Sequence, residues 1–469
     1  MLKFKDNIKL YLILAMIALV SIFTYQFPFF GDMTYISQVA HFILENGLSK
    51  IINPEIDNGT PPLFSFYLAS GWLILGKKLW IAHLLILPIF LGLIYQFYKL
   101  SLKFTSKNTS LIAISLLLID PTFSTQFLLM GYDIAIVFFF LLGLNSIIDK
   151  KYIFLIISTI FISLLNLRGF SIVLGLFIIE VYYWKNYNIK AIIKSGIVFI
   201  PAFIAVISWL SYHYSIMDWI AVNSSNTNLH GIQGLNWAAK NFVFELLALS
   251  GNGRIFVLGL SSALLIILFL KKQVSQLNEL KQLVIITVLA VLPFFALFTA
   301  MKYPVGPRYF MVSYPLIYLG LVMLIHQFQS IKLKASLLSL IAILIIASNF
   351  WMNPYPYSNS WDSSLKVLAY FKIQEELIEK IQADSIPPKS IYTSFPLHKN
   401  LKLAYVNPEL DIHFQDFDIE KIKIGDYVIY SNIYNHLELG NELNQPLNST
   451  LVFEKKQMGA WMKMYKISK

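Results

Sequence analysis

The sequence predicts an all-α polytopic membrane domain followed by a small α/β domain at the C-terminus. Of the 469 residues, 57% are hydrophobic and 13% are charged, which is about half the charged fraction of a typical soluble domain. The apolar residues form long blocks with almost no charge, such as 10–23 and 337–347. Blocks that recur at a scale of about 20 residues are typical of membrane spans. After Asn353-Pro354 the composition becomes polar, which indicates a new domain.

We expect about eleven transmembrane helices, each an apolar run bounded by polar or turn-forming residues. The runs are 10–27, 79–98, 109–127, 134–148, 153–167, 170–184, 195–212, 254–270, 282–300, 309–326 and 335–350. Three lysines precede the first run and no small-residue cleavage site follows it. We therefore expect it to be retained as a span rather than removed as a signal peptide.

The apolar segment 61–76 is expected to form a surface helix in the first outer loop. It begins with Pro61-Pro62 and is short for a span. With this segment on the surface, the loops on the amino-terminal side of the membrane hold twice as many lysines and arginines as the opposite loops. The positive-inside rule then places the amino terminus in the cytoplasm and the C-terminal domain outside. A twelfth span at 61–76 would destroy this asymmetry.

We place the domain boundary so that residues 1–352 form the membrane domain and residues 353–469 form the extracytoplasmic α/β domain. In the second domain a helical pattern covers 362–382. Strand-like runs follow it, at 390–394, 403–407, 427–431 and 451–454.

The formal net charge of +11 does not indicate nucleic acid as a partner. In a protein of the cytoplasmic (inner) membrane, lysines in cytoplasmic loops fix the orientation and account for such an excess. The chain has no cysteine, which excludes disulfides, thiolate metal sites and thiol catalysis.

The arginines are the first candidates for a binding site. Of the 37 lysines and arginines, only three are arginines: Arg168, Arg254 and Arg308. Each lies at the end of an expected span, next to a glycine or a proline. All three fall on the predicted outer face. Arginine offers a rigid fork that matches phosphate oxygens, so an anionic partner is one interpretation. An ion pair with a neighbouring acid or an anchor at the interface is the other.

Asp32 and Asp133 are the candidate catalytic acids on the same face. Asp32 comes just after the first span, and a helical pattern follows both residues. A carboxylate at the membrane surface can act as a general base towards an acceptor hydroxyl. An aspartate before a helix is equally a common N-cap. The residues alone leave this choice open.

Several segments together resemble a known signature. They are Gly31-Asp32-Met33-Thr34-Tyr35, Pro61-Pro62-Leu63-Phe64, Asp120-Pro121 with Asp133, Leu167-Arg168-Gly169 and Arg308-Tyr309-Phe310. Their order along residues 1–330 resembles that of the clan-C glycosyltransferases, and more narrowly the family of protein O-mannosyltransferases and lipid A aminoarabinose transferases. The C-terminal domain carries no such resemblance.

The resemblance implies an inverting glycosyltransferase that moves a monosaccharide from a polyprenyl phosphate to a lipid, glycan or protein acceptor at the outer face. It implies that Asp32 is the general base and that Asp133 positions the acceptor or a metal. Arg168, Arg308 and Tyr309 would bind the donor phosphate, and Arg254 is included in that expected set. Tyr35 and His230 are the expected contacts to the sugar or acceptor. The loop 213–252, which contains His230, either closes over the sugar or is an ordinary surface loop.

Two departures from the family pattern affect these expectations. Many relatives have a second acid after the first, where this chain has Met33, and some have an acid or lysine before the Pro-Pro pair, where it has Gly59-Thr60. A divalent metal therefore stays open, and no cofactor is assigned. The alternatives are a transporter or flippase of lipid-linked sugars, and a non-catalytic relative that serves as a subunit. An oligosaccharide polymerase or ligase is disfavoured by the early Asp32 and the Pro-Pro helix.

Overall fold

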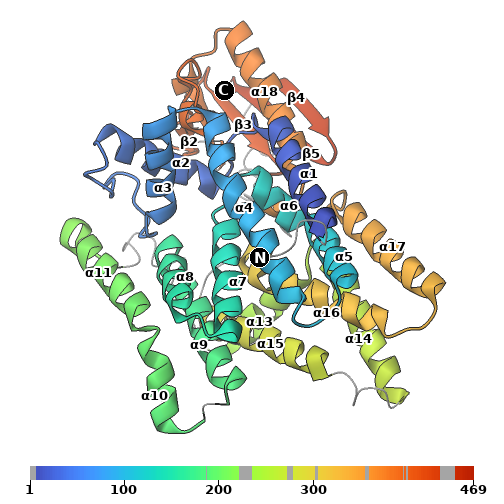
Figure 1. Ribbon diagram of the computed structural model, residues 1–469. Coiled ribbons are helices and arrows are strands. Elements are labelled where there is room, and N and C mark those ends of the chain that lie inside the picture. The colour runs from blue at the N-terminus through green and yellow to red at the C-terminus, as the bar shows by residue number, and fades with distance from the viewer. Residues whose placement is uncertain are drawn as a thin grey trace.

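The computed structural model describes most of the chain. The described residues are 7–185, 187–220, 235–271, 278–301, 305–353, 359–394, 396–397, 400–433 and 449–468. The amino-terminal three quarters are helical, and a small sheet lies near the C-terminus (Figure 1).

The helices up to residue 348 form one bundle. They are α1 (Ile8–Thr24), α2 (Asp32–Glu45), α3 (Leu63–Leu75), α4 (Leu79–Ser101), α5 (Lys107–Leu118), α6 (Pro121–Leu128), α7 (Asp133–Asp149), α8 (Tyr152–Leu165), α9 (Gly169–Tyr183), α10 (Ile189–Ile197), α11 (Ile200–Met217), α13 (Leu235–Ser250), α14 (Arg254–Leu270), α15 (Asn278–Thr299), the 3₁₀ segment η4 (Pro307–Ser313), α16 (Tyr314–His326) and α17 (Ile331–Ser348). The segment η4–α16 is 83% buried, whereas α11 and α17 are each 17% buried. The segment η4–α16 therefore runs through the middle of the bundle.

The protein is a multi-pass membrane protein. Among the described residues, five helices are long and apolar enough to cross a membrane, or up to seven if each bent pair forms one span. Large apolar side chains on their outer surfaces are exposed, including Phe203 of α11 and Ile343 of α17, as expected for contact with lipid. The predicted count of eleven stays a prediction, because several predicted spans are helices of fewer than 18 residues. The segment 61–76 contains α3, a helix of 13 residues.

Two helix pairs meet at a sharp bend. The first lies within one predicted span, whereas α13 of the second lies in the predicted loop 213–252. The run 109–127 is divided into α5 and α6, which meet at 67°. The side chain of Asp120 caps α6 by accepting the Phe123 amide at 3.0 Å, and Pro121 occupies the first turn. Helices α13 and α14 meet at 91°. There Gly253 has φ +82°, and a Cβ on it would approach Ser348 to 2.8 Å, so the turn requires glycine.

The C-terminal region consists of one helix against a five-stranded sheet. Its main elements are η5 (Trp361–Ser363), α18 (Val367–Ala383), β1 (Ile391–Thr393), α19 (Leu401–Ala404), β2 (Gln415–Asp416), β3 (Tyr427–Ser431), β4 (Ser449–Gln457) and β5 (Ala460–Ile467). The strand order is β2-β1-β3-β5-β4. β1 pairs in parallel with β2 and β3, and β5 pairs antiparallel with β3 and β4. The predicted strand at 403–407 is wrong, because α19 extends to Ala404 and a turn follows it. The domain boundary at 352/353 stays a prediction.

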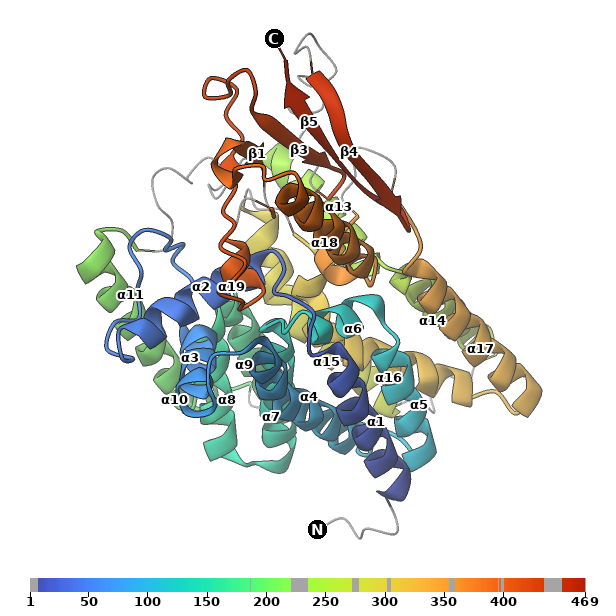
Figure 2. The same ribbon diagram turned by 90° about the horizontal axis from the view of Figure 1, so that it is seen from above.

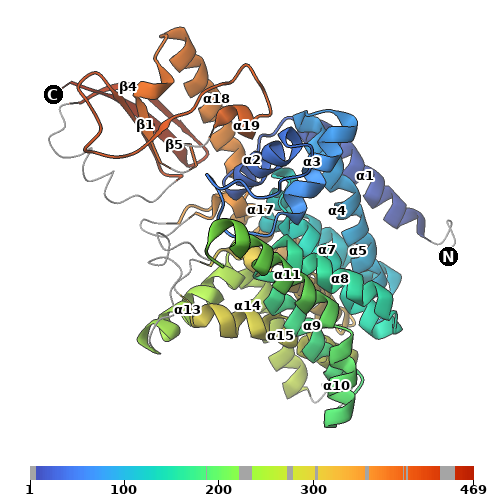
Figure 3. The ribbon, with the colours of Figure 1, turned by 90° about the vertical axis from the view of Figure 1, so that its left-hand side faces the viewer.

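This region lies over one end of the bundle, beside α2 and α3 (Figures 1, 2 and 3). Phe30 and Leu129, from the turns before α2 and after α6, are buried in the same apolar core as α18. The Phe30 ring lies 5.3 Å from that of Tyr370. The C-terminal region is thus packed directly on the turns that begin α2 and follow α6.

A lysine is buried at the junction between α17 and α18. Lys366 is 3% exposed, and its Nζ donates to the Trp351 carbonyl at 2.5 Å. Burial lowers its pKa from 10.5 to about 8. The cost of burying the ammonium is therefore present in full below pH 8, and it disappears as the pH rises to 10.5. We expect Lys366→Met to raise the melting temperature at pH 7, and the difference from wild type to shrink between pH 8 and 10.5. A difference that is independent of pH would contradict this account.

Candidate active site

Asp32 is the first residue of α2 and its carboxylate contacts Arg308. The N-cap of the helix is Gly31, whose φ of +58° favours glycine, and no side chain caps the helix. Oδ2 of Asp32 accepts from Nη2 of Arg308. The Asp32 side chain is 51% exposed. The carboxylate is therefore held by a guanidinium and open to solvent, and it does not serve as an N-cap.

Asp133 is the first residue of α7 and pairs with Arg168. Here too no side chain caps the helix, and Oδ1 of Asp133 accepts from Nη2 of Arg168. Arg168 lies in the turn between α8 and α9, where the next residue, Gly169, touches α8. A Cβ on Gly169 would lie 2.2 Å from the Ile162 carbonyl oxygen. The Arg-Gly sequence thus allows the close helix contact that brings Arg168 to Asp133.

The segment η4 supplies Arg308 and Tyr309, and these two residues connect the Asp32–Arg308 pair to the Asp133–Arg168 pair. The Arg168 guanidinium lies 3.9 Å from the centre of the Tyr309 ring, and that of Arg308 lies 5.3 Å from it. Nε of Arg308 is also 3.9 Å from Oδ2 of Asp133. The structure therefore brings together five of the residues that the sequence singled out, from the starts of α2, α7 and η4 and the turn before α9.

A third acid in this cluster, Asp362, was missed by the sequence analysis. It lies in η5, and its Oδ2 is 3.1 Å from Nε of Arg308. The residue falls in the segment that sequence patterning assigned to a helix of the second domain. An acid just after the Asn353-Pro354 boundary was the only available signal, and it carried no indication of the partner.

One atom of the cluster lacks a hydrogen bond. Oδ2 of Asp133 is buried and has no hydrogen-bond partner among the described residues. A buried carboxylate oxygen is costly unless something donates to it. In this conformation its hydrogen-bonding capacity is therefore unused, and Nε of Arg308 lies 3.9 Å from it. Two guanidinium groups and three carboxylates make up the cluster, so a bound phosphate would meet cations that are already paired.

Arg254 does not belong to this cluster. It is fully buried at the start of α14, where Nη1 donates to Oδ2 of Asp120 at 2.8 Å and to the Thr122 hydroxyl at 3.0 Å. Tyr318 of α16 donates to the same Asp120 oxygen at 2.7 Å. The ion-pair interpretation of this arginine is therefore the one that the geometry favours, and we remove Arg254 from the expected phosphate-binding set.

The residues expected to contact the sugar are only partly described. The Tyr35 hydroxyl accepts the Asn58 amide at 3.4 Å. Burial, followed by the charge of Asp57, raises the pKa of Tyr35, so it is protonated at neutral pH. Asp57 also lies 2.7 Å from Nε2 of His213, at the end of α11. This pair, which the sequence analysis did not predict, ties the first loop to α11. His230 lies outside the described residues.

The question of a metal ion stays open. Within the part of the chain that the structure describes, no group of three or more potential ligands is arranged to hold one. The three carboxylates of the cluster face guanidinium groups.

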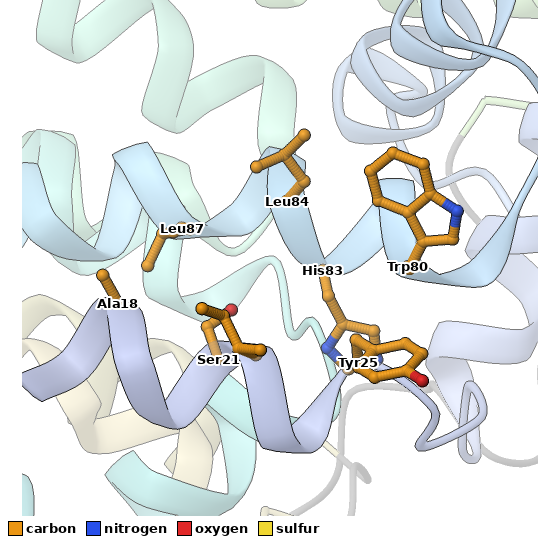
Figure 4. A pocket seen from close by; sticks show the side chains of 8 residues that line it. Ala18, Ser21, Tyr25, Trp80, His83, Leu84 and Leu87 are labelled. Atoms are coloured by element: carbon orange, nitrogen blue, oxygen red, sulfur yellow. The ribbon is translucent and has the colours of Figure 1, made fainter.

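A separate cavity of about 290 Å³ lies between α1 and α4 (Figure 4). Its lining is mostly apolar, with Ser21, Tyr25 and His83 among its polar members. None of its residues belongs to the cluster around Arg308. The lining suits a hydrocarbon chain better than a sugar.

Comparison with known proteins identifies the fold. Over 98% of both chains, the structure matches two crystal structures of ArnT from Cupriavidus metallidurans. For ArnT bound to undecaprenyl phosphate the TM-score is 0.55 at 11% sequence identity, and for the apo state it is 0.53 at 10%. No family model matches the sequence, and no curated protein matches it either. The chain thus has the fold of ArnT, an aminoarabinose transferase, with very little sequence in common.

Proposed function

We propose that the protein is a membrane glycosyltransferase that transfers a monosaccharide from a polyprenyl phosphate to an acceptor at the outer face of the cytoplasmic membrane. The observation that carries this proposal is the contact between Asp32 and Arg308. The guanidinium groups of Arg168 and Arg308 both lie near the Tyr309 ring, so Arg168 belongs to the same place. A base and two guanidinium groups in one place match the needs of displacement from a lipid phosphate. The shared fold with a protein solved with undecaprenyl phosphate supports the class of donor.

The reaction would be a single displacement with inversion. Asp32 takes the proton of the acceptor hydroxyl or amine while the oxygen or nitrogen of the acceptor attacks the anomeric carbon. The bond from that carbon to the phosphate oxygen breaks, and the polyprenyl phosphate leaves with the electron pair. Arg308 and Arg168 stabilise the negative charge that grows on this oxygen. The free Oδ2 of Asp133 accepts a hydrogen bond from a substrate hydroxyl and positions it.

A transporter of lipid-linked sugars is the second candidate, because the two bent helix pairs resemble the broken helices of transporters. The charged groups at the first bend are, however, bonded to one another: Asp120 pairs with Arg254 and accepts from Tyr318. Of the Arg254 nitrogens only Nη2 has no hydrogen-bond partner among the described residues, and such a buried network suits a structural role. The group that faces solvent is instead the carboxylate of Asp32.

Mass spectrometry of envelope lipids, glycans and proteins tests the proposal. Cells that carry the protein should contain a glycoconjugate with one additional monosaccharide, and cells without it, or with Arg308→Ala, should lack that product. Lys421→Ala, which removes an exposed cation paired with Asp418, should leave it unchanged. If no glycoconjugate differs, and the purified protein releases no polyprenyl phosphate from a lipid-linked sugar, the proposal is wrong.

A further inference from the structure

The Arg308 guanidinium is shared between two carboxylates from distant parts of the chain. Asp32 contacts Nη2, and Asp362 lies 3.1 Å from Nε. The Nε–H and one Nη2–H of a guanidinium point in the same direction along one edge, and this edge binds two oxygens of a phosphate or carboxylate at once. Asp362 therefore lies at one of the two N–H positions of this edge, and Asp32 contacts the nitrogen that carries the other.

Hydrogen bonds from other parts of the chain hold the backbone around Asp362 in place. The Gln126 side chain, from α6, donates to the Asp362 carbonyl at 2.7 Å, and Asn252 donates to the Ser363 carbonyl at 2.6 Å. Thr122 donates to the same Ser363 carbonyl at 3.3 Å. These three residues come from the two bends of the bundle, so the bends fix the segment η5 and direct the Asp362 side chain at Arg308.

The fit around Gln126 is close. A Cβ on Gly131, in the turn before α7, would lie 1.9 Å from the Gln126 side-chain oxygen. The Asp362 side chain itself is 33% exposed. Its backbone is therefore fixed, whereas its carboxylate is partly open to solvent and accepts from the Ser363 hydroxyl at 3.1 Å through Oδ1.

From this geometry we propose that Asp362 is the resting counter-ion of the donor-phosphate site: its carboxylate occupies the Nε position of Arg308 and is displaced by a phosphate oxygen when the lipid donor binds. The inference rests on the proposed function and adds a residue of the C-terminal region to the site. A carboxylate that must leave opposes phosphate binding in two ways, because it occupies the donor N–H and it repels the incoming anion.

Binding of undecaprenyl phosphate to the purified full-length protein tests the inference. Asp362→Asn removes the charge at constant size, and we expect the dissociation constant to fall about tenfold, as for one charged contact. Asp384→Asn, which removes an acid of the same region paired with Lys380, should bind as wild type does. If Asp362 only stabilised the structure, Asp362→Asn would bind the lipid more weakly than wild type. Unchanged or weaker binding by Asp362→Asn overturns the inference.

Further arms separate the possible failures. If Asp362→Asn does not give a folded protein, Gln126→Leu decides, because it keeps the carboxylate and releases its backbone, and it too should bind more tightly. Inorganic phosphate is titrated in parallel. A gain for inorganic phosphate alone overturns the assignment to the lipid donor. If wild type and Arg308→Ala bind the lipid equally, the proposed function fails. If Arg308→Ala loses binding and Asp362→Asn gains none, only this inference fails.

Discussion

Replacement of Asp32 by asparagine is expected to lower the turnover number for sugar transfer by about 10²–10⁴-fold, the usual contribution of a general base, without weakening donor binding. Asparagine has nearly the same size but cannot accept the acceptor's proton. The substitution also removes an anion from the Arg308 guanidinium, so the donor phosphate meets less competition. The measurement is transfer from a polyprenyl-phosphate sugar by purified protein, with turnover and the donor KM determined separately.

The control for this variant lies on the same helix. Glu45→Gln removes an exposed carboxylate at the other end of α2, where it pairs with His41, and it should transfer at the wild-type rate. Near-normal turnover with a raised donor KM would make Asp32 a binding residue. A loss of both sugar transfer and donor binding, together with aggregation in size-exclusion chromatography, would indicate a structural role. The expected separation of turnover from binding is thus specific to a base.

The order of motifs along the chain predicted part of the cluster. Asp32, Arg168 and Arg308 were placed at the ends of spans on one face, and such ends meet when helices pack side by side. Whether an aspartate caps its helix depends on the local backbone, which a sequence pattern does not show. Asp120 is the cap, whereas Asp32 and Asp133 make ion pairs instead.

The rest depended on contacts between distant segments. Arg254 has the same kind of local context as the other two arginines, a span end beside a glycine or a proline. It differs in the acid that it meets across 134 positions. Asp120 is the only charged residue between Lys107 and Asp133. The run around the 67° bend was therefore predicted as one continuous span. Asp362 reaches Arg308 only because the C-terminal region packs on the bundle.

Arg254→Met is expected to lower the free energy of unfolding by about 3–5 kcal/mol, because it leaves a buried carboxylate without its cation. Asp120 and Arg254 are both completely buried. The double variant Arg254→Met/Asp120→Asn should recover much of this loss. Its amide oxygen can still cap α6 by accepting the Phe123 amide, and its amide nitrogen can donate to the Tyr318 oxygen, to which the carboxylate is hydrogen-bonded now. No charge then stays buried. Thermal unfolding of the wild type, both single variants and the double variant in one detergent gives the coupling energy.

The same set of variants decides between the two interpretations of this arginine. A structural ion pair requires a large stability loss in Arg254→Met, a partial return in the double variant, and residual transfer in proportion to the folded fraction. A phosphate ligand requires unchanged unfolding and lost donor binding, which Asp120→Asn could not restore. Since Tyr318 and Thr122 bond to the same pair, the network joins α6, α14 and the central α16. Its loss should therefore also loosen the bends whose side chains hold the backbone of Asp362.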